Sequence, residues 1–252
     1  MCYISYKKIK IYKKKCYIII MLDFEKIKAN IEAVHNDEIL PPMSITTEIP
    51  AENKLVILID IVGFSKGTTK EQVYKIYCFE HYVIKQVISN LRNFKNRIKI
   101  NQFIPTGDGC YIVADECEPK LALDFLVSLI KGFQYIKNGD KEPWALRASA
   151  IFGECVPFLD LAHHKNYIGE GMNEAARILS YGQNALENKY LAENPDAKVL
   201  DAKLFSRNSL YVGESLADEL SNYGDEKNIY YFEKVADKHG KCRDITVLQG
   251  LK

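Results

Sequence analysis

Apolar residues follow two kinds of spacing along this chain, and from about residue 55 the two kinds alternate. Runs rich in Ile and Val, such as Leu55–Val62, are typical of strands that are buried on both faces. Longer stretches repeat apolar residues every three or four positions, as helices with one buried face do. In chain order, the pattern predicts a strand, a helix, two strands, a helix and a strand: Leu55–Val62, Thr69–Phe94, Ile98–Thr106, Cys110–Ala114, Pro119–Tyr135 and Leu146–Phe152.

This order predicts an α+β fold with a ferredoxin-like βαββαβ core, in which one sheet with antiparallel strands carries its helices on one face. The remaining chain is interpreted as a C-terminal elaboration of that core. Its predicted helices are Gly171–Leu179, Ala185–Ala192 and Val212–Leu220, and its predicted strands are Lys198–Leu200, Ile229–Lys234 and Asp244–Leu248.

The segment before the core divides into two parts. Residues 1–20 carry six lysines and no acidic residue, which favours a basic tail or a mis-assigned start ahead of a true first residue, Met21. A basic membrane-surface segment and a poor signal peptide are the alternatives. Residues 21–53 are expected to form a short amphipathic helix, Phe24–Val34, and a linker, which leaves residues 54–252 as one domain.

Composition excludes several classes of protein. Of the 252 residues, 47% are hydrophobic, and 34 basic against 33 acidic residues give a formal net charge of +1. The chain is too apolar to be disordered and too balanced to bind nucleic acid mainly through its overall charge. No apolar run approaches the ~18–20 residues that span a bilayer. Seven cysteines without a CxxC pair indicate free thiols in a reducing, cytoplasmic compartment.

Two aspartates, Asp60 and Asp108, are candidate metal ligands. Asp60 interrupts the apolar first strand, where its burial is costly unless a positive group meets it. Asp108 lies at the tip of the hairpin predicted between the second and third strands. In a ferredoxin-like sheet these positions are neighbours, and two carboxylates side by side suit Mg²⁺ or Mn²⁺. Taken singly, a strand-end cap and a turn aspartate explain them equally well.

Two further groups suit an anionic ligand. Gly63, Phe64 and Ser65 form a turn after the first strand, where backbone N–H groups can point at an anion. Asn173 and Arg177 are four residues apart on a predicted helix and therefore share a face. Arginine is well suited to charge that develops on phosphate, although an ordinary solvated helix face has the same spacing.

Four motifs resemble those of the class III nucleotidyl (adenylate and guanylate) cyclases. They occur in the order found in that family, and the resemblance extends over residues 55–250. It implies that residues 54–252 form a cyclase catalytic domain. The four motifs are Leu58–Ser65, Pro105–Gly109, Arg147–Glu154 and Gly169–Arg177.

The resemblance also implies a reaction. A ribose 3′-hydroxyl attacks the α-phosphorus of a nucleoside triphosphate, and pyrophosphate leaves, with two Mg²⁺ or Mn²⁺ ions in each site. Asn173 would orient the ribose, and Arg177 would stabilise the transition state. The family takes its metal aspartates from one subunit and this Asn and Arg from the other, which implies a homodimer. The other implied contacts are Asp60, Ile61 and Asp108 to metal, and Gly63, Phe64, Ser65 and Lys234 to the substrate phosphates.

Two positions depart from the purine-reading residues of the family. Ile104 stands where adenylate cyclases have Lys and guanylate cyclases have Glu, and Asn166 stands where an Asp is usual. An amide can pair with an edge of uracil or cytosine. A loop over residues 155–168 is expected to narrow the pocket. Its candidate side chains are Phe158, His163, His164 and Tyr167.

These departures resemble the pyrimidine cyclases of bacterial antiphage defence. We therefore expect cyclic UMP or cyclic CMP, made for a separate cyclic-nucleotide-binding effector, with no nucleic acid partner and no membrane span. An adenylate or guanylate cyclase and a non-catalytic nucleotide-binding dimerisation module are the alternatives. A diguanylate cyclase would need a Gly-Gly-Asp/Glu-Glu-Phe hairpin, where this chain has Gly-Asp-Gly-Cys-Tyr.

Overall fold

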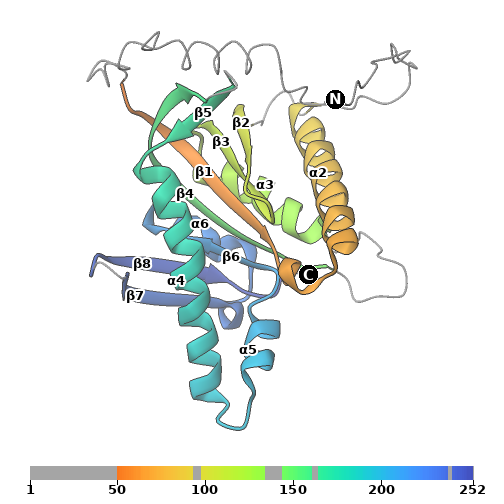
Figure 1. The fold of residues 1–252 in the computed structure, drawn as a ribbon. Helices are drawn as coiled ribbons and strands as arrows, with labels where there is room; N and C mark the ends of the chain where they lie inside the picture. Colours follow the sequence, from red (N-terminus) through yellow and green to blue (C-terminus); the bar gives the residue numbers. More distant parts are fainter. Residues whose placement is uncertain (1–49, 93–97, 134–143, 161–163, 238–239, 252) are drawn as a thin grey trace, which may run out of the picture.

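A computed structural model describes residues 50–92, 98–133, 144–160, 164–237 and 240–251 (Figure 1). The predicted helix Phe24–Val34 and residues 1–20 lie outside the described residues. The described chain forms one eight-stranded mixed sheet with helices on both faces. This confirms the α+β class: the two helices of the core share one face of the sheet, as predicted, and a helix of the C-terminal elaboration covers the other face.

The predicted core strands all form, and β1 (Glu52–Ile61) lies between two antiparallel neighbours. On one side it pairs with β3 (Gly109–Asp115), which in turn pairs with β2 (Ile100–Pro105). On the other side it pairs with β4 (Leu146–Leu159), which is longer than predicted and also pairs with β5 (Lys165–Ile168). The end of β1 and the β2–β3 hairpin therefore meet at the same edge of the sheet.

Three C-terminal strands extend the sheet beyond β4. Strand β6 (Ser209–Val212) pairs in parallel with β4, and β8 (Cys242–Leu248) joins β6 to β7 (Ile229–Ala236). The full order is β2-β3-β1-β4-β6-β8-β7, with β5 attached to β4 outside this path. The final pair of strands was predicted, whereas β6 was not, because four fully buried residues show no alternation.

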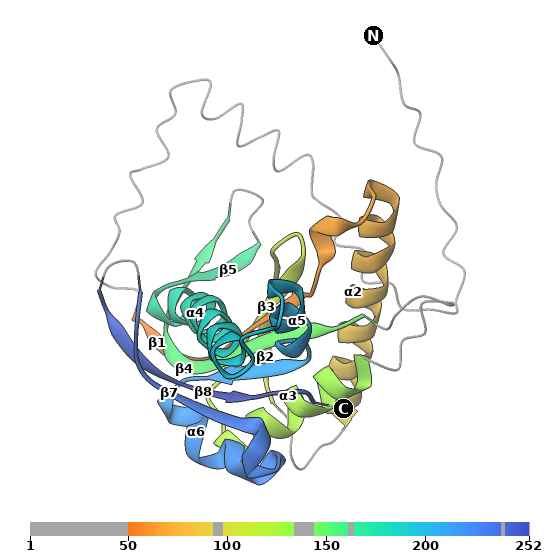
Figure 2. The same ribbon diagram turned by 90° about the horizontal axis from the view of Figure 1, so that it is seen from below.

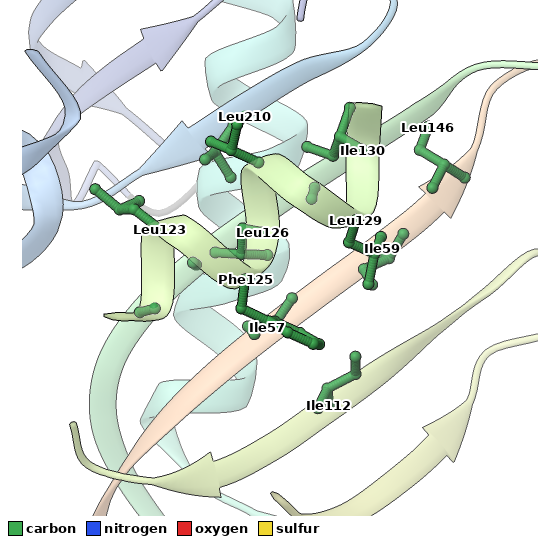
Figure 3. Close-up of a cluster of buried hydrophobic side chains, with 14 of the residues drawn as sticks. Ile57, Ile59, Ile112, Leu123, Phe125, Leu126, Leu129, Ile130, Leu146 and Leu210 are labelled. Atoms are coloured by element: carbon green, nitrogen blue, oxygen red, sulfur yellow. The ribbon is translucent and has the colours of Figure 1, made fainter. Parts of the chain in front are cut away.

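One face of the sheet is covered by α2 (Thr69–Arg92), α3 (Pro119–Phe133) and α6 (Glu214–Leu220). Figure 3 shows side chains of α3, among them Leu126 and Leu129, directed at Ile57 and Ile59 of β1. Each such side chain, once removed from water, contributes about 1.5–3 kcal/mol to folding. This packing holds β1, and with it Asp60, in place.

The opposite face carries α4 (Glu170–Glu193), which Figure 2 shows nearly end-on, on the other side of the sheet from α6. Val56 and Leu58 point to this side, because successive strand residues face opposite ways. The continuous apolar run of β1 thus reflects burial on both faces, as predicted. Helix α5 (Val199–Phe205) follows α4, and the short 3₁₀ helices are η1 (Phe64–Lys66), η2 (Ser221–Tyr223) and η3 (Glu226–Asn228).

Two predictions for the C-terminal half are wrong. The segments Gly171–Leu179 and Ala185–Ala192 are helical as predicted, but the expected break between them is absent, because both belong to α4. Gly182, in the middle of this helix, lies against Tyr211. The predicted strand Lys198–Leu200 is the start of α5, where the Lys198 N–H donates to Asp201 Oδ2 at 2.8 Å.

No helix in the described part of the chain has the length and hydrophobicity that a membrane span requires.

Candidate active site

Asp60 and Asp108 are neighbours in the folded chain. Asp60 pairs with Gly109 in the β1–β3 ladder, and the Ile61 N–H donates to the Asp108 carbonyl at 3.0 Å. Gly109 permits this approach, because a side chain there would overlap the Ile59 carbonyl. Burial raises the pKa of the Asp60 carboxyl, and Asp108 adds to the rise while Arg147 opposes it. The two carboxylates are therefore close enough to affect each other.

Arg147 of β4 is the positive group that the burial of Asp60 requires. It lies opposite Asp60 in the β1–β4 ladder and forms an ion pair with it. Its other terminal nitrogen donates to Gln183 of α4. The motif containing Arg147 was identified from the sequence, but its contact with Asp60 was not predicted. Because a bound cation would compete with Arg147 for Asp60, this ion pair is part of the site.

The residues present fit a divalent cation that takes most of its ligands from substrate and water. A cation between the two carboxylates would relieve the repulsion from Asp108, which adds to the rise that burial causes in the pKa of Asp60. Ile61 can contribute only its backbone carbonyl, because an N–H group is a donor. The described residues contain no group of three or more His, Cys, Asp or Glu that could hold a metal ion. Mg²⁺ is typically bound by one or two carboxylates and substrate phosphates, which matches this donor set.

The turn after β1 lies directly beside the two aspartates. Gly63 has a φ of 70°, in the left-handed region that favours glycine, and η1 begins immediately after it. The Lys66 N–H donates to the Gly63 carbonyl at 3.3 Å. In the described residues, no acceptor is found for the N–H groups of Gly63, Phe64 and Ser65. The turn itself forms as predicted, and binding of an anion by these three groups stays a prediction.

Asn173 and Arg177 lie on the first turns of α4. Asn173 is exposed, whereas Arg177 pairs with Glu170 at 2.9 Å and with Glu174 at 3.3 Å. The start of α4 packs closely on β4. A Cβ on Gly171 would lie only 3.0 Å from the Gly153 carbonyl, so the glycine permits this approach. The sheet thus sets the position of both side chains.

A network of charges behind Arg177 was not predicted from the sequence. Arg243 of β8 forms ion pairs with Glu174 and with Asp237, the latter at 3.0 Å. Asp237 also lies 3.7 Å from Arg177 Nε. The side chains of Arg243 and Asp237 are only 6% and 2% exposed. The sole sequence signal was a pair of acidic residues four apart on α4, which does not reveal partners about 70 residues away.

The two predicted halves of the site do not meet within one chain. Gln183 contacts Arg147 beside Asp60, and Asn173 lies ten residues before Gln183 on the same helix. At about 1.5 Å per residue, Asn173 and Gln183 are about 15 Å apart along α4. The structure therefore places Asp60 beside the middle of α4, through Arg147 and Gln183, and Asn173 and Arg177 on the first turns of the helix.

The predicted base-reading positions lie on strands. Ile104 of β2 is paired with Tyr111 and packs against the α4-side cluster. The expected loop over residues 155–168 is instead the β4–β5 hairpin around residues 161–163, which lie outside the described residues with His163. Asn166 lies opposite Phe158, and its Oδ1 accepts from the Tyr167 N–H at 2.8 Å. Tyr167 is 4% exposed, so it belongs to the core and does not line an open pocket.

Solved cyclase structures have a similar fold. The guanylate cyclase domain of RhGC from Catenaria anguillulae, solved with GTP, gives a TM-score of 0.53 at 16% identity, over 79% of this chain and 96% of that chain. The catalytic core of a rhodopsin-guanylyl cyclase with converted specificity, solved with ATPαS, gives 0.52 at 16%, over 79% and 97%. A bacterial light-regulated adenylyl cyclase gives 0.52 at 11%, over 92% and 66%.

This chain has the class III nucleotidyl cyclase fold. No family model matches the sequence, and no curated protein matches it. The cyclase fold therefore rests on the structural comparison, and it agrees with the four motifs found in the sequence.

Lys234, the predicted triphosphate lysine, lies in β7 of this cyclase fold. Its φ is 52°, and its N–H donates to Asp244 Oδ1 at 2.8 Å, at the irregularity in the β7–β8 pairing. The Lys234 side chain is exposed. The structure brings it close to neither aspartate through any contact among the described residues.

Proposed function

We propose that the protein is a metal-dependent nucleotidyl cyclase, which converts a nucleoside triphosphate into a 3′,5′-cyclic nucleotide and pyrophosphate. The observation that carries this proposal is the proximity of Asp60 and Asp108 at the end of β1, beside the turn Gly63–Ser65. The cyclase fold supports it. Residues 54–252 would form the catalytic domain.

Each group has a part in the proposed reaction. Asp60, Asp108 and the Ile61 carbonyl would hold two Mg²⁺ or Mn²⁺ ions, which when bound offset the charge of the triphosphate and favour loss of the ribose hydroxyl proton. The N–H groups of Gly63, Phe64 and Ser65 would donate to phosphate oxygens. Lys234 would add a contact to the triphosphate.

Asn173 and Arg177 would act on the substrate held by a second subunit. Arg177 would donate to the phosphate oxygens as the α-phosphorus is attacked, and Asn173 would orient the ribose. The separation of the two halves along α4 supports a twofold homodimer with two shared sites. Arg177 would then exchange its contacts with Glu170 and Glu174 for the substrate.

The proposed base is a pyrimidine, UTP or CTP. Ile104 offers no polar group to a purine edge, and the amide of Asn166 both donates and accepts. The Asn166 oxygen accepts from the Tyr167 N–H, so its N–H₂ group would be the one that donates to the base. The product would be cyclic UMP or cyclic CMP, a cytoplasmic messenger to a separate effector in antiphage defence.

The experiment supplies the purified protein with Mn²⁺ and with ATP, GTP, CTP or UTP in separate reactions, and identifies the products by mass. We expect cyclic UMP or cyclic CMP with pyrophosphate. Asp108→Asn should abolish product, and the matched Asp124→Asn, on the exposed side of α3, should not. Cyclic AMP or cyclic GMP would retain the cyclase and refute the pyrimidine. No product from any nucleotide would refute the cyclase.

A further inference from the structure

Arg177, the proposed transition-state residue, lies among carboxylates on the first turns of α4. It is 2.9 Å from Glu170, 3.3 Å from Glu174 and 3.7 Å from Asp237. The side chain of Glu170 is half exposed, whereas those of Glu174 and Asp237 are 12% and 2% exposed. A phosphate oxygen can bind Arg177 only by displacing these contacts. The strength with which the two buried carboxylates hold Arg177 therefore bears on the proposed reaction.

Arg243 of β8 competes with Arg177 for the same two buried carboxylates. It donates to Glu174 and, at 3.0 Å, to Asp237. Its guanidinium lies over the ring of Tyr181 on α4, 5.8 Å from the ring centroid. A carboxylate shared between two guanidinium groups holds each of them less strongly, because the two like charges also repel each other. Arg243 thus weakens the hold of Glu174 and Asp237 on Arg177.

Stability alone does not account for a buried cation at this place. The Arg243 Nη1 atom is buried and has no hydrogen-bond partner among the described residues. A buried donor without an acceptor costs free energy. Apolar side chains of similar volume often replace a complete buried ion-pair cluster without loss of stability. Apolar packing would therefore be enough to attach α4 to the β7–β8 hairpin.

We propose that Arg243 is a positioning residue, which holds Glu174 and Asp237 so that Arg177 can exchange them for substrate phosphate. This role rests on the proposed function, because Arg243 acts only through the residue that would stabilise the transition state. Without Arg243, the attraction of the two buried carboxylates would fall more strongly on Arg177. The substrate would then have to break a stronger ion pair.

The first test compares kcat and KM of the full-length variants with the nucleoside triphosphate that gives the most product. Arg243→Met keeps most of the aliphatic side chain and removes its charge. We expect kcat to fall at least tenfold while KM changes less than threefold, because Arg177 would act in the transition state. Arg243→Lys should retain most of kcat. Adding Glu174→Gln to Arg243→Met should recover most of it, since one of the charges that hold Arg177 is removed.

The matched control is Lys54→Met. Lys54 is also a buried cation between two carboxylates, Glu52 at 2.6 Å and Asp115 at 2.8 Å, and its side chain is 9% exposed. Among the described residues, it makes no ion pair with Arg177 or with the carboxylates around it. Lys54→Met should therefore lower stability but change kcat less than twofold. Circular dichroism shows that each variant is folded at the assay temperature.

The second test does not depend on turnover. Phenylglyoxal reacts with the neutral form of a guanidinium group, so carboxylates that hold an arginine slow its modification. The Arg177 side chain is 27% exposed and can be reached by the reagent. We expect its modification, followed by peptide mass, to slow at least threefold in Arg243→Met and to stay unchanged in Lys54→Met. Glu174→Gln alone should speed it, which provides a test that does not require Arg243→Met to fold.

Two results would overturn the proposal. One is a rate of Arg177 modification that neither Arg243→Met nor Glu174→Gln changes. The other is a loss of kcat in Arg243→Met that Lys54→Met reproduces, since a general loss of stability would then explain both. A protein that makes no cyclic nucleotide, but whose Arg177 modification slows in Arg243→Met, would overturn the proposed function and retain the control of Arg177 by Arg243.

Discussion

At the scale of single residues, Asp60 is the position where stability and function make opposite demands. It is placed in a buried strand next to a second carboxylate, and Arg147 offsets only part of that cost. Burial raises its pKa, so the folded state holds the proton more tightly than the unfolded chain does. An acid with a raised pKa in the folded state reduces stability as the pH rises above its unfolded value of about 3.9.

Asp60→Asn should therefore abolish turnover without destabilising the protein at pH 7. The neutral amide resembles the protonated acid, so the difference in Tm should shift in favour of the variant between pH 4 and pH 7. Thermal unfolding of both proteins across this range measures it. A variant that is less stable at pH 7, with a deficit that disappears on acidification, would make Asp60 a structural partner of Arg147 only.

At the scale of elements, the start of α4 is held to the β7–β8 hairpin by buried ion pairs. Arg243 faces both Glu174 and Asp237, and its removal would leave two buried carboxylates with Arg177 as the remaining cation beside them. Lys241 makes a pair with Glu170 at 2.7 Å on the same hairpin, but its side chain is exposed. The two pairs join the same elements and differ in burial.

Arg243→Ala should lower the free energy of unfolding by about 3–5 kcal/mol, as breaking a buried ion pair does. Lys241→Ala should lower it by less than about 1 kcal/mol, because solvent screens an exposed pair. Urea unfolding of both variants gives the comparison. Equal effects would show that burial does not set the strength of this attachment.

At the scale of the whole molecule, the long α4 decides how an active unit can be built. Along this helix, Asn173 lies about 15 Å and Arg177 about 9 Å from Gln183, which contacts Arg147 beside Asp60, so the proposed site is divided into two halves within one chain. In the proposed head-to-tail pair of chains, each half would be completed by the other chain. The proposed dimer thus follows from the length and direction of one helix.

Mixing Asp60→Asn chains with Arg177→Ala chains should restore activity that neither has alone. Half of the randomly formed dimers would contain one of each chain, with one intact site of two, so we expect about a quarter of wild-type turnover. The product assay measures it after subunit exchange. A mixture as inactive as its parts would contradict shared sites, provided that sedimentation shows mixed dimers.

Much of the fold could be predicted from the sequence, because its signals are local. Three local patterns each predicted the conformation of their own segment: the apolar run of β1, the helical spacing of α2 and α3, and the glycines around Asp108. The four motifs likewise placed Asp60, Asp108, Asn173 and Arg177 on the correct kinds of element. What failed was short or depended on neighbours, as in β6, whose four buried residues become a strand only by pairing with β4 and β8.

The sequence by itself therefore determined the order of the core elements and the two aspartates at the end of β1. Only the tertiary structure decided that Arg147, 87 residues away, would meet Asp60, and that Arg243, 69 residues away, would meet Glu174. It also placed α4 on the second face of the sheet. The spacing of apolar residues within a segment indicates which conformation that segment prefers. These contacts form only when segments far apart in the sequence pack together.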